Sequence, residues 1–431
     1  MSKPVRFIIA LWGLSLCVPW QTAQAEQAGA AASVSSSGAE LGQLSDFIAK
    51  VLKNSPRARS LEASMQASVA RRQAADRPLH NPELALEAER TDVNTRSIGL
   101  SQAVDWSGKR RARSEQAGFE LKAASARAAV SRQALASELL KALADHGAAD
   151  QLNQLAQERV RLMGQFAHIA DQRRAAGDLD QVEYDLASLA ALQAELEAAE
   201  FSARLGDARR ALQVLAGAAG ASQWPSLPDS PHGIQMQQAN LDVLLKSHPS
   251  YLASQAAVEA ARSAVELRQR EARPDPTVGL RAGREDSDRL TALTLSVPLF
   301  VRNRYKAEVQ EANALLEQAG QEARTNWLDL HSRAEVSRQR YLLTRKTWTS
   351  WQKRGQTSLQ RRTSLLKRLW QAGELSTTDY LVQLKQTLET QGAAVELRGR
   401  LWRAWADWLQ ASGTVFQWLG LKDDFTTIAE Q

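Results

Sequence analysis

Residues Asp275–Phe300 read DPTVGLRAGREDSDRLTALTLSVPLF, and residues Asn81–Trp106 repeat the pattern as NPELALEAERTDVNTRSIGLSQAVDW. In each copy, apolar residues alternate with small or polar ones on both sides of a polar turn. Because successive side chains of a strand point to opposite faces, this alternation predicts a β-hairpin with one apolar and one polar face. The apolar positions are Val278, Leu280, Leu293, Leu295, Val297 and Leu299 in one copy and Leu84, Leu86, Ile98, Leu100 and Val104 in the other.

Neither predicted hairpin would be stable alone in water, so the strands must join into a sheet, within one chain, between copies of the chain, or both. Each strand is about ten residues long, which is the length that crosses a bilayer when the strand is tilted. A soluble sheet that is half-buried against helices fits the same alternation. The strands alone therefore leave a membrane sheet and a soluble sheet as open alternatives.

Residues 1–25 have the features of a secretory signal peptide. Basic residues precede an apolar run, Phe7–Val18, and small residues follow at Ala23–Ala25, where cleavage is expected. Cys17 is the only cysteine, and the bulky Leu16 before it disfavours lipidation. The mature chain is therefore expected to contain no disulfide and no cysteine-based metal site.

The composition argues against several classes of function. The net charge is +6, and the 24% of charged residues mix both signs along the chain, which is not typical of a nucleic-acid-binding protein. The basic and aromatic run within Arg345–Arg362 is interpreted as a solvated helix face with packed tryptophans. The six histidines lack metal-ligand spacing, so no metal site and no cofactor are predicted. No nucleophile elbow or phosphate loop is present, which argues against an enzyme.

Outside the hairpins the sequence predicts helices arranged as a tandem duplication. In each half, a helix broken at Asn54-Ser55-Pro56 or at Ser247-His248-Pro249 precedes the hairpin. The predicted organisation is a signal peptide (1–25), a flexible low-complexity segment (26–40), a first repeat (41–216, strands about 82–90 and 97–106), a connector (217–240), a second repeat (241–420, strands about 276–284 and 290–300) and a C-terminal tail (421–431).

After each hairpin comes a proline-free run of about 60 to 70 residues, which predicts an uninterrupted helix roughly 90 to 100 Å long. Each run ends at a glycine turn, near Gly177 or Gly373, and a return helix follows. Apolar residues at heptad spacing predict a coiled-coil seam on both return helices. The seam positions are Val182, Leu189, Leu192, Leu196, Ala199 and Ala203 in the first helix and Leu381, Leu384, Leu388, Val395, Trp402, Trp405 and Leu409 in the second.

This order of elements resembles the TolC family of outer-membrane factors over nearly the whole mature sequence. Two motifs carry the resemblance: Ile98–Gln102 before Gly108-Lys109-Arg110, and Leu295–Phe300 before Arg302-Asn303-Arg304. The segment Asn81–Leu84, together with the Gly-Lys-Arg turn, is similar to the CzcC-like heavy-metal efflux branch.

The resemblance implies a mainly α protein with membrane β-strands. In this family, three chains with four strands each share one twelve-stranded barrel in the outer membrane, and the long helices form a coiled-coil α-barrel in the periplasm. The implied function is a passive exit duct for heavy-metal cations, delivered by an inner-membrane pump of the RND type and a periplasmic adaptor, the membrane fusion protein. The polar strand residues would line the lumen and the leucines would face outer-membrane lipid. Trp106 and Phe300 would belong to an interfacial aromatic belt or simply pack locally.

The same resemblance places the two glycine turns at the periplasmic tip, where the channel closes and contacts its adaptor. Asp379 matches the first aspartate of the family pattern after the second turn, whereas the second position is Val382. Read without the family, these carboxylates stabilise the starts of helices against the macrodipole. The candidate tip, gate and adaptor-contact residues are Gly177, Asp178, Glu183, Gly373, Glu374 and Asp379.

A second function remains open from the sequence, namely a secreted or periplasmic coiled-coil scaffold or adaptor without a pore. An adaptor of that kind has a single helical hairpin and β-rich domains. The duplicated halves with strands of membrane length disfavour it.

Overall fold

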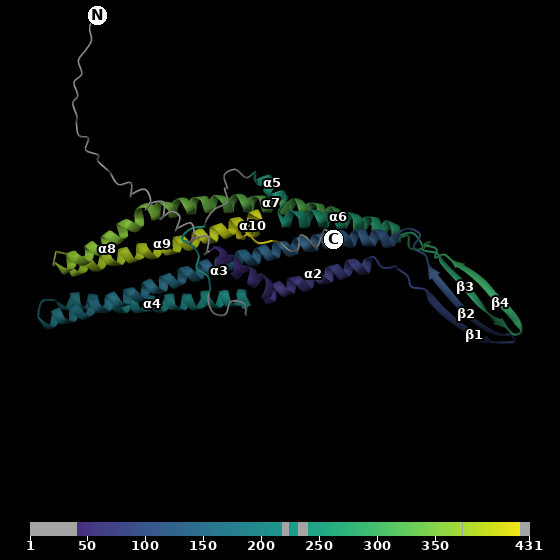
Figure 1. Cartoon of the computed structure of the whole chain (residues 1–431), viewed down its shortest axis with the longest axis horizontal. Coiled ribbons are helices and arrows are strands. Elements are labelled where there is room, and N and C mark those ends of the chain that lie inside the picture. The colour runs from purple at the N-terminus through teal and green to yellow at the C-terminus, as the bar shows by residue number, and fades with distance from the viewer. Residues whose placement is uncertain (1–40, 218–223, 232–239, 373, 423–431) are drawn as a thin grey trace, which may run out of the picture.

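The computed structural model describes residues 41–217, 224–231, 240–372 and 374–422. The predicted signal peptide with Cys17, the low-complexity segment and the turn residue Gly373 lie outside these residues. The molecule is elongated, with a β-sheet at one end and the turns of two helical hairpins at the other (Figure 1).

The strands of the two hairpins form one antiparallel sheet. It consists of β1 (Glu83–Arg90), β2 (Asn94–Ala103), β3 (Thr277–Glu285) and β4 (Asp288–Ser296), in the order β1-β2-β3-β4. The two copies of the repeat are therefore joined through β2 and β3 within one chain. The ladders end before Trp106 and Phe300, which the alternation had placed at the strand ends.

The first half contains a helix over 41–54, α2 (Pro56–Ala75), α3 (Lys109–Ala175) and α4 (Gln181–Ala216). α3 has 67 residues and is therefore about 100 Å long. The long uninterrupted helix predicted after the first hairpin is confirmed.

The second half contains α5 (Leu241–Lys246), α6 (Pro249–Glu271), α7 (Lys306–Ser350), a π-helix at Trp351–Gly355, α8 (Gln356–Gln371), α9 (Thr377–Ser412) and α10 (Val415–Leu419). The helix predicted after the second hairpin is present from Lys306 to Gln371, but a π-turn at Trp351–Gly355 interrupts its regular α-helical geometry between α7 and α8. A Cβ on Gly355 would lie 2.2 Å from a ring carbon of Trp351, so the indole occupies space that only glycine leaves open. None of the described helices has an apolar stretch long enough to cross a bilayer.

The main core lies where the helix over 41–54, α3, α7 and α9 meet. Trp402 and Trp405 are fully buried there, and the Trp402 Nε1–H donates to the Pro228 carbonyl at 2.9 Å. The Tyr341 and Trp405 rings lie 4.8 Å apart between centroids. Most of the seam predicted on α9 is buried, which confirms that part of the pattern: Leu381, Leu384, Leu388, Trp402, Trp405 and Leu409.

The seam predicted on α4 is exposed in the single chain. Val182, Leu189 and Leu196 are 75%, 63% and 74% exposed. α4 packs against α3, and the α4 residues buried between Ala187 and Ala198 are small: Ala187, Ala194 and Ala198. Heptad spacing identified the apolar stripe but could not tell which side of the helix its own chain would cover.

Candidate functional site

The strand register assigns every residue of the sheet to one of two faces, because directly paired residues share a face. Leu84 pairs with Leu100, Leu100 with Leu280, and Leu280 with Leu293, which gives an unbroken row of leucines across all the strands. These leucines are 56% to 77% exposed. The apolar face predicted from the alternation is therefore present, and no described element covers it.

The opposite face is polar. Arg281 on β3 forms an ion pair with Glu87 on β1, and the Ser97 hydroxyl donates to Glu87 at 3.2 Å. Glu83 and Ser296, predicted to line a lumen, lie on this face by register. The structure thus reproduces the division of residues between the faces.

The first helical tip is the turn from α3 to α4. Gly177 adopts a left-handed conformation with φ 81°, which favours glycine. The Asp178 N–H donates to the Arg173 carbonyl at 2.9 Å, which closes the end of α3. The Asp180 carboxylate accepts from the Glu183 N–H at 2.8 Å and so caps α4. Glu183 is half-buried and Asp178 is exposed.

The second tip is the turn from α8 to α9. Ser376 caps α9: its hydroxyl accepts from the Asp379 N–H at 3.0 Å and donates to the Asp379 carboxylate at 2.7 Å. Asp379 therefore takes the same position in α9 that Glu183 takes in α4, the third residue after the cap. Asp379 and Glu374 are exposed, and no cation pairs with either of them among the described residues.

A small apolar cluster joins the two helical hairpins behind their tips. The Phe166 ring on α3 stacks on the Tyr380 ring on α9, with centroids 6.2 Å apart. Leu366 on α8 and Leu384 on α9 belong to the same cluster. Both turns therefore lie at the same end of the molecule (Figure 1). The fold therefore brings the predicted tip carboxylates to one end of the molecule: Asp178, Glu183, Glu374 and Asp379. The hydrogen bonds with Ser376 at the start of α9 are enough to explain the local geometry of Asp379.

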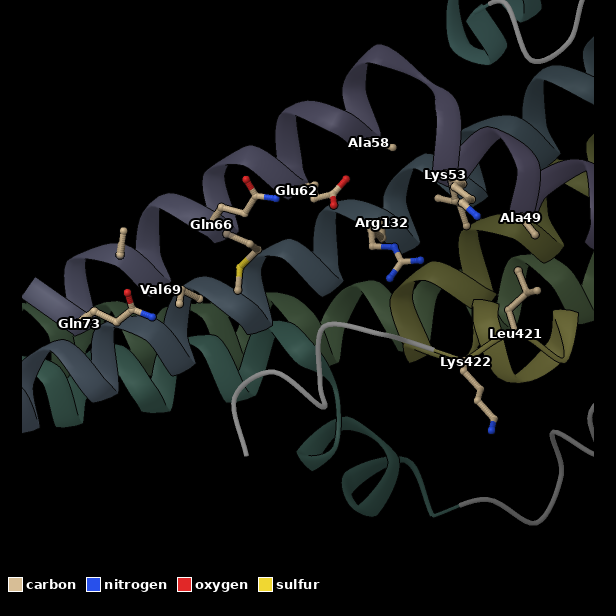
Figure 2. Close-up of a pocket in the computed structure, with 13 residues that line it drawn as sticks. Ala49, Lys53, Ala58, Glu62, Gln66, Val69, Gln73, Arg132, Leu421 and Lys422 are labelled. Carbon is tan, nitrogen blue, oxygen red and sulfur yellow. The ribbon is translucent and has the colours of Figure 1, made fainter. Parts of the chain in front are cut away.

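One surface feature was missed by the sequence analysis. A groove of about 820 Å³ lies along the helix over 41–54 and α2, where apolar Met65 and Val69 and charged Glu62 line it (Figure 2). Arg132 of α3 and the segment Leu421–Lys422 also contribute to its lining. The spacing of apolar residues on α2 contained the signal, but nothing in the sequence showed that α3 would leave this face partly uncovered.

The histidines do not form a metal site in the described part of the chain, where no group of three or more metal-ligating side chains comes together. His80 lies 3.2 Å from the Asp275 carboxylate, and His331 lies 3.5 Å from that of Asp242. The His146 ring packs against Trp224 with centroids 4.8 Å apart.

The chain therefore combines a sheet with one apolar and one polar face and two long helical hairpins. Residues 47–218 match the model of a family described as outer membrane efflux protein. The chain is 27% identical over 264 residues to the cobalt-zinc-cadmium resistance protein CzcC of Cupriavidus metallidurans. That alignment covers 59% of the chain and 62% of CzcC, so the match spans less than two thirds of this relative.

Solved structures have the same fold. A membrane protein from Pseudomonas aeruginosa has a TM-score of 0.74 at 18% identity, covering 86% of this chain and 93% of that one. The CmeC outer membrane channel of Campylobacter jejuni has a TM-score of 0.74 at 16% identity, covering 90% of this chain and 88% of that one. The resemblance to the TolC family and its CzcC-like branch, and the predicted mainly helical TolC-like fold, are confirmed.

Proposed function

We propose that the chain is a subunit of a passive outer-membrane channel of a tripartite efflux system. The sheet carries this proposal, because it exposes a leucine-rich face on one side and an ion-paired polar face on the other. In water the leucine face would remain unburied at a substantial cost in free energy. In a bilayer, lipid covers the leucines while the polar face lines water.

The free edges of the sheet support assembly with further copies. β1 and β4 are each paired on one side only within the described residues. Unpaired backbone N–H and C=O groups are very unfavourable in a hydrocarbon environment, so a membrane sheet must close on itself. Four strands are too few to enclose a pore, whereas a homotrimer would supply twelve strands in one barrel. The exposed apolar stripe of α4 would then pack against a neighbouring copy.

The helical tips are the proposed gate and adaptor contact. Gly177, Asp178, Glu183, Gly373, Glu374 and Asp379 are the candidate residues. Three copies would place rings of carboxylates around the axis, which would attract cations and narrow the passage. A periplasmic adaptor would bind here and connect the channel to an inner-membrane pump of the RND type. The channel itself would perform no chemistry, because the pump would supply the energy.

Heavy-metal cations are the proposed cargo. The similarity to CzcC, a cobalt-zinc-cadmium resistance protein, supports this class of substrate. The exposed carboxylates at the tip suit cations, and an exit path needs no tight metal site. Deleting the gene should make the host sensitive to cobalt, zinc or cadmium, and the intact gene should restore resistance. Unchanged metal tolerance would overturn this choice of cargo without contradicting the proposal that the protein is a channel.

The channel is tested by measuring the mass of the detergent-purified protein together with its conductance in a planar lipid bilayer. A trimer that produces discrete conductance steps is expected. A soluble monomer or dimer without conductance would overturn the membrane assignment and favour a coiled-coil scaffold in its place.

A further inference from the structure

A row of arginines crosses the apolar face of the sheet near its turns. The register pairs Arg96 on β2 with Arg284 on β3, and Arg284 with Arg289 on β4. Neighbouring strands lie about 4.8 Å apart, so these side chains leave the sheet next to one another. Arg90 lies on the same face of β1, one pair nearer the turn. All of them are exposed.

This arginine row, defined as Arg90, Arg96, Arg284 and Arg289, has no anionic partner on its own face. Within the part of the chain that the structure describes, none of the guanidinium groups forms an ion pair or a hydrogen bond. The acidic residues at the same level lie on the polar face, because Thr95 pairs with both Glu89 and Glu285, and Glu285 pairs with Asp288. Like charges directly opposite one another destabilise a sheet. Folding of the single chain therefore gives no reason for the row.

The position of the row along the strands matches a membrane boundary. From Arg96 to the end of β2 at Ala103, and onward to Trp106 if the chain stays extended, ten residues would span about 26 Å along the barrel axis at a tilt of roughly 40°. That span is close to the apolar band of about 25 Å in membrane barrels. Ile98, Leu100 and Val104 are exposed in this interval, and the polar side chain of Gln102 on the same face is hydrogen-bonded to the His80 and Ala103 carbonyls. The row therefore lies where hydrocarbon ends and headgroups begin.

We propose that the arginine row binds the phosphate groups of an anionic lipid whose acyl chains cover the leucines beside it. The occupant is a phosphate-bearing glycolipid of the lipid A class in the leaflet at the turn end of the sheet. Guanidinium groups bind phosphate through paired N–H donors, and bound phosphates would relieve the repulsion between opposed arginines. Both hairpins contribute one arginine on each strand, so a trimer would present the row repeatedly around its circumference. The inference rests on the proposed membrane position of the sheet.

The test compares the full-length protein in detergent with the variant Arg96→Gln/Arg284→Gln/Arg289→Gln, titrated with fluorescent diphosphoryl lipid A. A matched control removes three exposed arginines from helix surfaces, as Arg59→Gln/Arg71→Gln/Arg324→Gln; none of these has an ion pair among the described residues. The row variant should bind lipid A at least tenfold more weakly, and the control variant should bind like the unmodified protein. Dephosphorylated lipid A should bind the unmodified protein and the row variant equally.

Conductance of the unmodified protein separates the two proposals. A conducting trimer that binds phosphorylated and dephosphorylated lipid A with equal affinity would overturn the inference and leave the channel intact. Full competition by inorganic phosphate would also overturn it, because the site would then need no lipid. If the triple variant fails to assemble, Arg284→Gln alone should still weaken lipid A binding measurably, and unchanged binding would again refute the row.

Discussion

The joint between the end of α9 and the start of α6 provides a sharp test of the packing. Gly413 ends α9 with φ 74°, and a Cβ at this position would lie 2.7 Å from Cδ2 of His248. His248 cannot move away freely, because its Nδ1 accepts from the Ser250 N–H at 3.0 Å and its Nε2 lies 3.2 Å from the Gln410 carbonyl. We predict that Gly413→Ala destabilises this joint far more than the left-handed backbone alone requires.

The expected magnitude follows from two contributions. A non-glycine residue in the left-handed region costs roughly 1 kcal/mol, and overpacking a buried site costs about 1–3 kcal/mol. Their sum for Gly413→Ala is about 2–4 kcal/mol. If the ring is displaced instead of the helix end, each lost hydrogen bond costs about 1 kcal/mol, which is of similar size.

Gly420 offers a matched control. It also ends a helix in the left-handed region, with φ 68°, but a Cβ there would meet nothing within 4 Å. Gly420→Ala should therefore cost only the backbone contribution, roughly 1 kcal/mol. Thermal unfolding in detergent, followed by the helical circular dichroism signal, should give the lower midpoint for Gly413→Ala. Equal midpoints for the two variants would show that the contact with His248 does not limit the packing.

Three further predictions concern pH, the tip and the sheet. Burial lowers the pKa of His248 despite the bond to the Gln410 carbonyl, so the contribution of the neutral ring to stability should be fully present above about pH 6.5 and be lost as the pH falls below it. In unfolding scans from neutral to acidic pH, His248→Asn should flatten this dependence. Asp379→Asn should weaken cation block in single-channel recordings, whereas Ser376→Ala, which removes the cap but keeps the charge, should not. If both variants weakened cation block equally, Asp379 would act only by stabilising the start of α9. Gly283→Ala should lower the yield of assembled trimer, because its Cβ would meet a β2 carbonyl at 2.1 Å, while Gly99→Ala, with 3.6 Å of room, should assemble normally; equal yields in detergent gels would contradict the close approach of β2 and β3.

Features with a local cause were predictable from the sequence. The faces of each hairpin follow from the alternation of side chains along a strand. The turn at Gly177 follows from the freedom of glycine to adopt the left-handed conformation that it has in the structure. The length of α3 follows from the absence of proline. The faces and the turn depend on residues within a few positions of one another, and the helix length depends on one continuous run, so a single sequence contains all of them in full.

Features that depend on distant segments were not predictable. The arginine row exists only because β2 pairs with β3 in a register that aligns Arg96 with Arg284. The sequence did contain a hint, since each hairpin has arginines on both strands close to its turn. The π-helix accompanies close packing of the Trp351 ring against Gly355, and the spacing of apolar residues along a helix does not predict such a contact.

The exposed apolar seam on α4 indicates how the molecule would be completed. α4 is apolar on two sides, with alanines toward α3 and the larger Leu189, Leu192 and Leu196 exposed on another side. A helix that is apolar on two sides lies between two neighbours, and among the described residues α3 is the only element that packs along α4 extensively. The sheet at the other end of the molecule is equally incomplete, because β1 and β4 each lack a partner on one side among the described residues. α3 links these two ends as a single helix, so further copies that close the sheet would also be positioned to cover α4. Closure of the membrane part and of the helical part would therefore be one assembly step.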